Sequence, residues 1–363
     1  YYGTYQNRED FDYQEGEYGV MSWWDYGHII TAQGERIPHA NPFQQGSDTA
    51  ANFLLAPNES QANTVLAGID EDDAQTRYVA VDWKMANTYS GLSNGKFFAP
   101  IRFTDMDVSQ RDYYNRVYNR QNTQRYFHVR SQRYYDSTVT RLYRYHGSAR
   151  EPQPVVVDWD IAQTRQGQQF RAAPQGSPTI RTFDTMEEAE AFVEEDGTAQ
   201  VGGFGAFPSE RVPAMEHYRY VGSSETGAYE SSAYNRGVLI ESFFLGPIQV
   251  GQPPGNQTGC GEGARTMPIN NQTFCMPNSD AGFMTGSYPA WTKIHERVPG
   301  GIIEGTGPAN ETITAAVPME NNITGESFTY QQQVRTGPDG TFEMTVPYST
   351  TGYDEYGTDA GYT

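Results

Sequence analysis

Residues 23–27 read WWDYG, and this pentapeptide decides how the first part of the chain folds. The four residues before it, GVMS at 19–22, are short and apolar and predict a buried strand. The residues after it, GHII at 27–30, predict a turn into a helix that ends near Gln33. The pentapeptide therefore lies at a strand-to-helix corner, where rigid elements can aim a binding group.

The side chains at this corner suit the recognition of one aliphatic hydroxyl group. The indole N–H groups of Trp23 and Trp24 only donate hydrogen bonds, and an ionised Asp25 only accepts them. Together they can accept the proton of a Ser or Thr hydroxyl and donate to its lone pairs. The alternative is that the two Trp residues belong to the core and that Asp25 caps the helix.

The pentapeptide resembles the signature of the catalytic subunits of oligosaccharyltransferases, which transfer a lipid-linked glycan to the Asn of Asn-X-Ser/Thr. All five residues match that signature: Trp23, Trp24, Asp25, Tyr26 and Gly27. The stretch HANPFQQG at 39–46 is similar to the AglB-type enzymes of haloarchaea. The resemblance implies that the pentapeptide binds the acceptor hydroxyl and that His28 lies near the phosphates of the donor. The alternative for His28 is an ordinary place on a helix surface.

A second short motif follows a predicted strand at 78–81 and consists of Asp82 and Met85. We expect a helix from Asp82 to about Tyr89, with these three side chains on one face. The family has an Asp followed three residues later by Lys or Met, and Tyr89 stands where Ile is more usual. The resemblance implies that Met85 contacts the methyl group of an acceptor Thr. Losing that methyl costs about 1 kcal/mol, which predicts a few-fold to tenfold preference for Thr over Ser. The alternative is that Met85 packs in the core and Asp82 caps a helix.

The charge balance excludes one class of function. A net charge of -20 and a pI near 4.6 oppose nucleic-acid binding and are typical of a halophilic source. One segment differs, because ten of the 25 Lys and Arg residues lie between Arg102 and Arg150, interleaved with Tyr. This segment, with a helix predicted from Asp112 to Asn122, can face lipid phosphates, a glycan or RNA, or it can pair within its own domain.

The fold class that we predict is α+β, with a mixed α/β core domain that carries the WWDYG corner, a β-rich insertion and a small C-terminal β-sandwich. The predicted divisions are a linker from a membrane half at 1–17, the core at 18–245, a disulfide loop region at 246–297, the β-sandwich at 298–347 and a second linker at 348–363. The clearest single helix is predicted at 185–195, after a capping box of Thr185 and Glu188.

The two cysteines indicate an oxidising compartment. Cys260 and Cys275 close a short loop rich in Gly, Pro and Asn, which a disulfide would stabilise by roughly 3 kcal/mol. Sequons at Asn256 and Asn271 accompany it, and both features fit the extracytoplasmic face of the cell membrane. No run in the sequence is long enough to cross a membrane, and residue 1 is Tyr rather than Met, so we expect a fragment. The resemblance implies that a membrane-spanning half precedes it.

The resemblance also implies a divalent cation, Mg²⁺ or Mn²⁺, held by acidic loops of that membrane half. The expected partners are acceptor polypeptides with Asn-X-Ser/Thr, a lipid-linked oligosaccharide donor and the chain's own membrane half, and we expect the fragment alone to be inactive. Two other functions fit the composition. One is a cell-surface glycan- or protein-binding module of a halophile, and the other is a glycoside hydrolase, which needs two carboxylates across a cleft.

Overall fold

A computed structural model describes residues 18–70, 75–90, 94–120, 123–225, 227, 265–269, 272–276, 290–321, 325 and 327–348. The predicted linkers at 1–17 and 348–363 lie outside these residues, apart from Tyr348. Cys260 lies outside them too, and only the backbone is described for the strand that holds Cys275. The disulfide between these two residues therefore stays a prediction.

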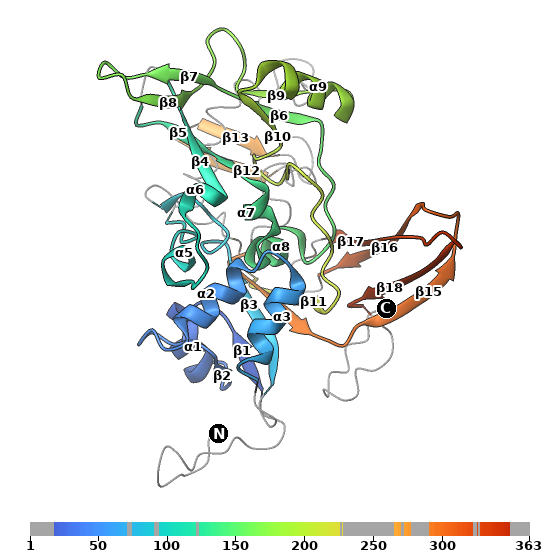
Figure 1. The fold of residues 1–363 in the computed structure, drawn as a ribbon. Coiled ribbons are helices and arrows are strands. Elements are labelled where there is room, and N and C mark those ends of the chain that lie inside the picture. The colour runs from blue at the N-terminus through green and yellow to red at the C-terminus, as the bar shows by residue number, and fades with distance from the viewer. Residues whose placement is uncertain are drawn as a thin grey trace.

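A five-stranded mixed sheet lies in the lower half of Figure 1, in the order β11-β14-β3-β1-β2. Its strands are β1 (Gly19–Met21), β2 (Ile37–Pro38), β3 (Thr76–Asp82), β11 (Tyr218–Ser223) and β14 (Thr292–Arg297). β1 pairs in parallel with β2 and β3, whereas β14 pairs antiparallel with β3 and β11. The predicted loop region at 246–297 thus contributes its last strand to the core sheet.

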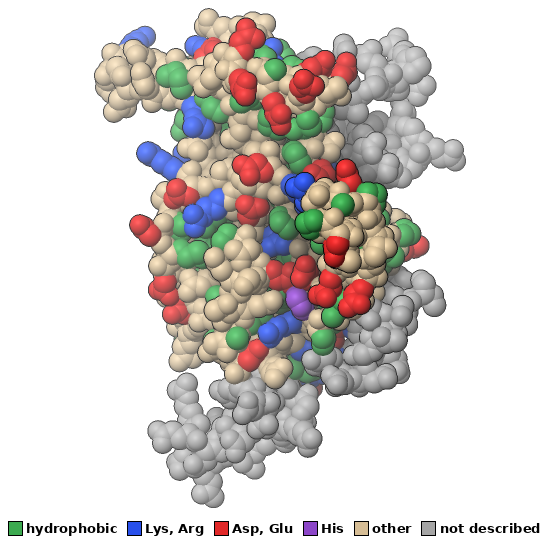
Figure 2. All heavy atoms as spheres, turned by 45° about the vertical axis from the view of Figure 1, so that its right-hand side comes forward, with side chains coloured by type: hydrophobic (Ala, Val, Ile, Leu, Met, Phe, Trp, Pro, Cys, Tyr) green, Lys and Arg blue, Asp and Glu red, His purple; other side chains and the backbone are tan. Residues whose placement is uncertain are grey.

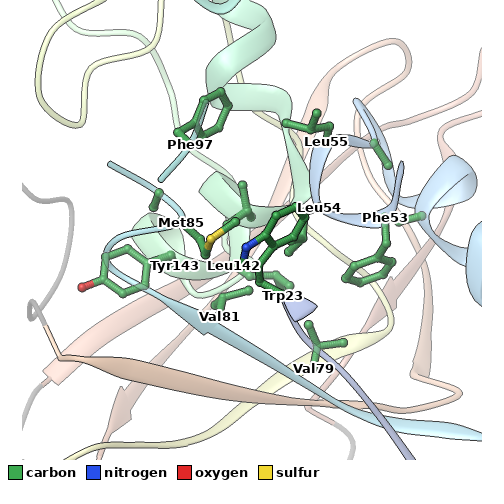
Figure 3. Packing of buried hydrophobic residues seen from close by; sticks show 14 of the residues in the cluster. Trp23, Phe53, Leu54, Leu55, Val79, Val81, Met85, Phe97, Leu142 and Tyr143 are labelled. Carbon is green, nitrogen blue, oxygen red and sulfur yellow. The ribbon is translucent and has the colours of Figure 1, made fainter. Parts of the chain in front are cut away.

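Helices pack with this sheet and with one another around the first hydrophobic core. They are α1 (Gly27–Ala32), α2 (Ser47–Leu55), α3 (Glu59–Ala67), α5 (Pro100–Phe103), α6 (Gln110–Tyr113), α7 (Gln132–Asp136) and α8 (Thr138–Tyr145). α8 packs against α2, β3 and β14. Figure 3 shows Trp23, Phe53, Val79 and Leu142 among the side chains of this core. Asn58 caps α3 by accepting the Gln61 N–H at 2.9 Å.

The β-rich insertion encloses a second core. One sheet has the order β5-β4-β8-β7 and the other the order β10-β6-β9. Their bounds are β4 (Tyr114–Tyr118), β5 (Tyr126–Arg130), β6 (Val155–Asp158), β7 (Asp160–Gln163), β8 (Gln169–Ala172), β9 (Ile180–Thr182) and β10 (Ala199–Val201). The helix predicted at 112–122 is wrong, because residues 114–118 form the strand β4, which pairs with β5. Val117 and Phe127 lie opposite each other on these strands, and both are buried in this core. α9 (Met186–Asp196) confirms the helix predicted after Thr185.

The C-terminal part is made of strand pairs. β15 (Gly301–Thr306) pairs with β18 (Thr341–Val346), and β16 (Thr312–Glu320) pairs with β17 (Ser327–Arg335), both antiparallel. β17 also lies near β18, so the two pairs adjoin and extend to the right of the core in Figure 1. A further antiparallel pair, β12 (Arg265–Ile269) with β13 (Gln272–Met276), lies outside this module.

The predicted helix from Asp82 to Tyr89 is also wrong. β3 runs through Asp82 and the chain then turns, with the Asn87 N–H bonded to the Lys84 carbonyl at 3.1 Å. The carbonyls of Lys84 and Asn87 also accept the N–H groups of Lys96 and Phe97, at 2.7 and 3.2 Å. A distant segment therefore occupies acceptors that a helix would use for its own hydrogen bonds.

Across the part of the chain that the structure describes, no helix has both the length and the apolar character needed to cross a bilayer.

Candidate functional site

The WWDYG corner has the predicted position between a strand and a helix. A short 3₁₀ helix, η2 (Trp24–Tyr26), connects β1 to α1. Gly27 is the first residue of α1. A larger residue does not fit at this position, because its Cβ atom would lie 2.2 Å from the Ala40 carbonyl oxygen. The loop that follows β2 thus presses against the corner and fixes its direction.

The two indoles of the corner differ in exposure. Trp23 is only 1 % exposed and belongs to the first core, as the alternative interpretation expected. Trp24 is half-buried, and the Phe103 ring of α5 lies 6.2 Å from its ring centroid. The Trp24 Nε1 atom is buried and has no hydrogen-bond partner among the described residues. An unsatisfied buried donor costs free energy, so this N–H group is suited to a ligand acceptor.

Asp25 pairs with Lys96, a residue that the sequence did not single out. Both side chains are partly exposed, and the Lys96 ammonium group also lies 5.8 Å from the centroid of the Tyr26 ring. The hydrogen bond from the Lys96 N–H to the Lys84 carbonyl holds its backbone in place. A lone Lys in a turn 71 residues after Asp25 gives no local signal, which is why the sequence did not reveal it.

Tyr26 and Asp82 join the two predicted motifs directly. The Tyr26 hydroxyl donates a hydrogen bond to one oxygen of the Asp82 carboxylate. The other oxygen accepts the Met85 N–H at 2.7 Å. Burial, followed by the nearby Asp82, raises the pKa of Tyr26, so that its hydroxyl stays protonated and able to donate. Burial likewise raises the pKa of Asp82, and the two hydrogen bonds oppose that rise.

The remaining predicted side chains lie at opposite extremes of exposure. Met85 is 1 % exposed and, like Trp23, is part of the first core shown in Figure 3. His28 is exposed on α1, with its ring 5.4 Å from that of Phe43, which is 80 % exposed. The structure thus brings Trp23, Asp82 and Met85 together in the interior, whereas His28 is exposed and Asp25 is partly exposed. Trp24 lies between these extremes, because it is half-buried and its Nε1 atom is enclosed.

No metal centre is evident in the described part of the chain, because it contains no group of three or more His, Cys, Asp or Glu side chains that could hold an ion. The described carboxylates of the site are already engaged: Asp25 pairs with Lys96, and Asp82 accepts two hydrogen bonds. These residues do not fit a divalent cation.

Comparisons with known proteins match both ends of the chain to one family. Residues 1–86 match the AglB core domain, and residues 300–363 match the long peripheral domain of archaeal glycosylation protein B. The chain is also 48 % identical over 374 aligned residues to a dolichyl-monophosphooligosaccharide–protein glycotransferase AglB of Haloferax volcanii. That alignment covers 100 % of this chain and 32 % of the relative, so the chain spans about a third of the relative's length.

Two solved structures of Archaeoglobus fulgidus oligosaccharyltransferases share the fold. One, in complex with Zn and sulfate, has a TM-score of 0.52 at 20 % identity and covers 97 % of this chain and 38 % of the other. The second, an AglB in complex with an inhibitory peptide and a dolichol-phosphate, has a TM-score of 0.51 at 19 % identity and covers 96 % and 34 %. At these identities the likeness shows a shared fold and not a shared function.

Proposed function

Because the chain belongs to the AglB oligosaccharyltransferase family along its whole length, we propose that it is the acceptor-recognition part of a glycosyltransferase. The full enzyme transfers a lipid-linked oligosaccharide of the dolichyl phosphate type to the Asn of Asn-X-Ser/Thr. The chain works at the extracytoplasmic face of the cell membrane, together with a membrane-spanning half. That half binds the donor and holds Mg²⁺ or Mn²⁺, the metal whose positive charge offsets charge on the departing phosphate.

The observation that carries this proposal is that a hydrogen-bond acceptor, the Asp25 carboxylate, lies next in the chain to a donor without a described partner, the Trp24 Nε1–H group. The Asp25 carboxylate keeps lone pairs beyond those that Lys96 uses, and it is partly exposed. The adjacent Trp24 Nε1 lacks a partner among the residues described. A Ser or Thr hydroxyl that donates to Asp25 and accepts from Trp24 satisfies both groups. Such a contact positions the acceptor Asn, which lies two residues earlier, for reaction.

Lys96, Tyr26 and Asp82 position this pair of groups. Lys96 holds the Asp25 carboxylate from one side, and the hydrogen bond from Tyr26 to Asp82 ties the corner to the turn that contains Met85. His28 extends from the exposed side of the same corner toward the donor phosphates, to which its ring N–H groups can donate. Met85 is buried, so an acceptor methyl reaches its thioether only after a neighbouring side chain moves.

The Asp25→Asn variant of the full-length enzyme tests the proposal. Asp25→Asn removes the charge from the hydrogen bond to the acceptor hydroxyl, and charge-assisted bonds of this kind contribute about 1.5–3 kcal/mol. We expect kcat/KM for a peptide with Asn-Gly-Thr to fall by roughly tenfold to hundredfold. Trp24→Phe keeps a ring against Phe103 but removes the N–H group, and we expect a loss of about twofold to tenfold.

Asp48→Asn is the matched control, because Asp48 is an exposed carboxylate on α2 whose substitution removes the same charge. Near-normal transfer by the Asp25→Asn enzyme refutes the proposal. The isolated chain is expected to transfer no glycan. Measurable transfer by it, in the presence of donor and either metal, contradicts the division of work between the two halves.

A further inference from the structure

The first half of the basic segment forms a strip of Arg and Tyr side chains that the proposed function leaves unused. We define the strip as Arg102, Arg116, Tyr118 and Tyr126, which are exposed or half-buried. The sequence from 94 to 130 contains seven Lys and Arg against three Asp, whereas the whole chain carries a net charge of -20. Acidic side chains are spread over the face of the molecule in Figure 2. The strip is therefore a positive region on an acidic protein.

The second half of the basic segment behaves differently. Arg130, Arg141 and Arg144 are buried. Arg141 donates to the backbone carbonyls of Pro213 and Ala214, at 2.9 and 3.0 Å. These side chains of the second half therefore pack inside the protein, and Arg141 bonds to backbone carbonyls rather than to a ligand. The exposed Arg residues of the segment lie in its first half, whereas Arg133 and Arg150 of the second half are half-buried.

α5 connects the strip to the WWDYG corner. Phe103, the last residue of α5, lies against both indoles, with ring centroids 5.6 Å from Trp23 and 6.2 Å from Trp24. The preceding residue, Arg102, is exposed, and its guanidinium group lies 4.9 Å from the centroid of the Phe98 ring. The strip thus begins one residue away from a side chain that contacts the proposed acceptor site.

The charged groups of the strip are available for a ligand. Arg116 is exposed on β4, and its guanidinium group lies 4.5 Å from the centroid of the Tyr126 ring. Tyr114, two residues before Arg116 on β4, is buried in the first core. Burial raises its pKa to about 12, and the positive charges of Arg116 and Arg102 oppose that rise. Neither Arg has a carboxylate partner among the described residues.

The aromatic groups of the strip are held by the sheet. Tyr118 on β4 lies 5.7 Å from Tyr126 on β5 and 5.9 Å from Phe170 on β8, measured between ring centroids. Val117 and Phe127, on the opposite face of the same two strands, are buried in the second core. The strip is therefore a rigid surface whose geometry is set before any ligand arrives, which lowers the entropy cost of binding.

We propose that the strip binds acidic residues that flank the Asn-X-Ser/Thr site of the acceptor polypeptide. The inference rests on the proposed function, because the strip begins beside the side chains proposed to hold the acceptor hydroxyl. A polypeptide held at the corner advances about 3.3 Å per extended residue, so its flanking residues pass over the neighbouring surface. Along this strip they meet guanidinium groups that bind carboxylates in bidentate fashion and rings that pack against apolar side chains.

A set of acceptor peptides in the full-length enzyme tests this inference. All share Asn-Gly-Thr, and the flanking residues on one side or the other are Glu, Gln or Lys. We expect KM to be about threefold to tenfold lower for Glu than for Gln flanks on one side, as two exposed ion pairs allow. The double variant Arg102→Gln/Arg116→Gln should bring this ratio close to one. Raising the salt from about 0.1 M to 1 M should also reduce it, because the screening length falls from ~10 to ~3 Å.

Arg165→Gln is the control, since Arg165 is exposed at the turn between β7 and β8 and its substitution removes one guanidinium charge outside the strip. It should leave the Glu-to-Gln ratio unchanged. The inference is overturned if the wild-type ratio is one, if the double variant keeps the wild-type ratio, or if that variant loses only affinity for the oligosaccharide donor. A failure of the proposed function gives a different result. In that case the Asp25→Asn enzyme glycosylates the Gln-flanked peptide as well as the wild-type enzyme does.

Discussion

At the scale of single residues, Asp82 is the side chain on which the arrangement of the two motifs depends. It is 7 % exposed, and burying a carboxylate is costly unless its oxygens accept hydrogen bonds. Tyr26 and the Met85 N–H supply one to each oxygen. Because the two donors come from different motifs, the requirement to satisfy this carboxylate holds the WWDYG corner and the Met85 turn in one fixed relation. Neither motif achieves this alone.

Met85 allows a prediction about the choice between Thr and Ser acceptors. In the full-length enzyme, Met85→Ala should reduce the Thr-to-Ser ratio of kcat/KM from a few-fold or more toward one while Asn-X-Ser/Thr is still used. The same change leaves a cavity in the core and should lower the free energy of unfolding by about 2–5 kcal/mol. Leu66→Ala creates a cavity in the same core from α3 and serves as the control. An unchanged ratio in the folded Met85 variant would show that the thioether only packs.

At the scale of elements, local patterns were enough where one segment decides its own structure. β1 follows from its apolar run, and α9 follows from the cap that Thr185 provides. The two wrong helices have a different cause. The chain after Asp82 turns because Lys96 and Phe97 take its carbonyls, and residues 114–118 become a strand because they pair with β5. Lys96 was missed as a partner of Asp25 for the same reason, since long-range pairing leaves no trace in a local pattern.

The contact between the turn after β3 and the segment at 94–97 gives a prediction at this scale. A Cβ atom on Gly95 would lie 2.3 Å from the Asn87 carbonyl oxygen and 2.8 Å from that of Tyr89. Gly95→Ala should therefore push the segments apart and lower the free energy of unfolding by about 1–3 kcal/mol, measured by urea denaturation. It should also raise the acceptor KM, because Lys96 moves away from Asp25. Gly222→Ala, with no atom within 4 Å of its new Cβ, should cost less than about 0.5 kcal/mol. Equal effects of the two changes would contradict this account.

At the scale of the whole molecule, a polar seam attaches the C-terminal strand module to the core. The Glu59 carboxylate, at the start of α3, accepts the backbone N–H groups of Glu216 and His217 at 2.6 and 2.8 Å. The Glu216 carboxylate in turn accepts from Gln332 of β17 at 3.0 Å, and the Tyr330 hydroxyl donates to the Met215 carbonyl at 3.0 Å. The module is therefore held by hydrogen bonds to the segment at 215–217, just before β11, and this segment is itself bonded to α3.

His217 makes part of this seam sensitive to pH. Its Nδ1 lies 3.1 Å from a Glu59 oxygen, and the hydrogen bond to Glu59 raises the pKa of His217 even though burial opposes it. A pKa raised in the folded state gives a stabilising contribution that is complete below about pH 6.5 and disappears as the pH rises through the folded value. His217→Gln should therefore destabilise the chain more at pH 5.5 than at pH 8.5. The difference should stay below about 1 kcal/mol, because the pair is partly exposed.

Urea denaturation at both pH values measures this difference, and a double-mutant cycle with Glu59→Gln assigns it to the pair. In the Glu59→Gln background the carboxylate is gone but an amide oxygen remains to accept a backbone N–H. His217→Gln should then have the same effect at both pH values. If the pH dependence survives in that background, another anionic group near His217, such as Glu216, is responsible, and the seam is not coupled to pH through Glu59.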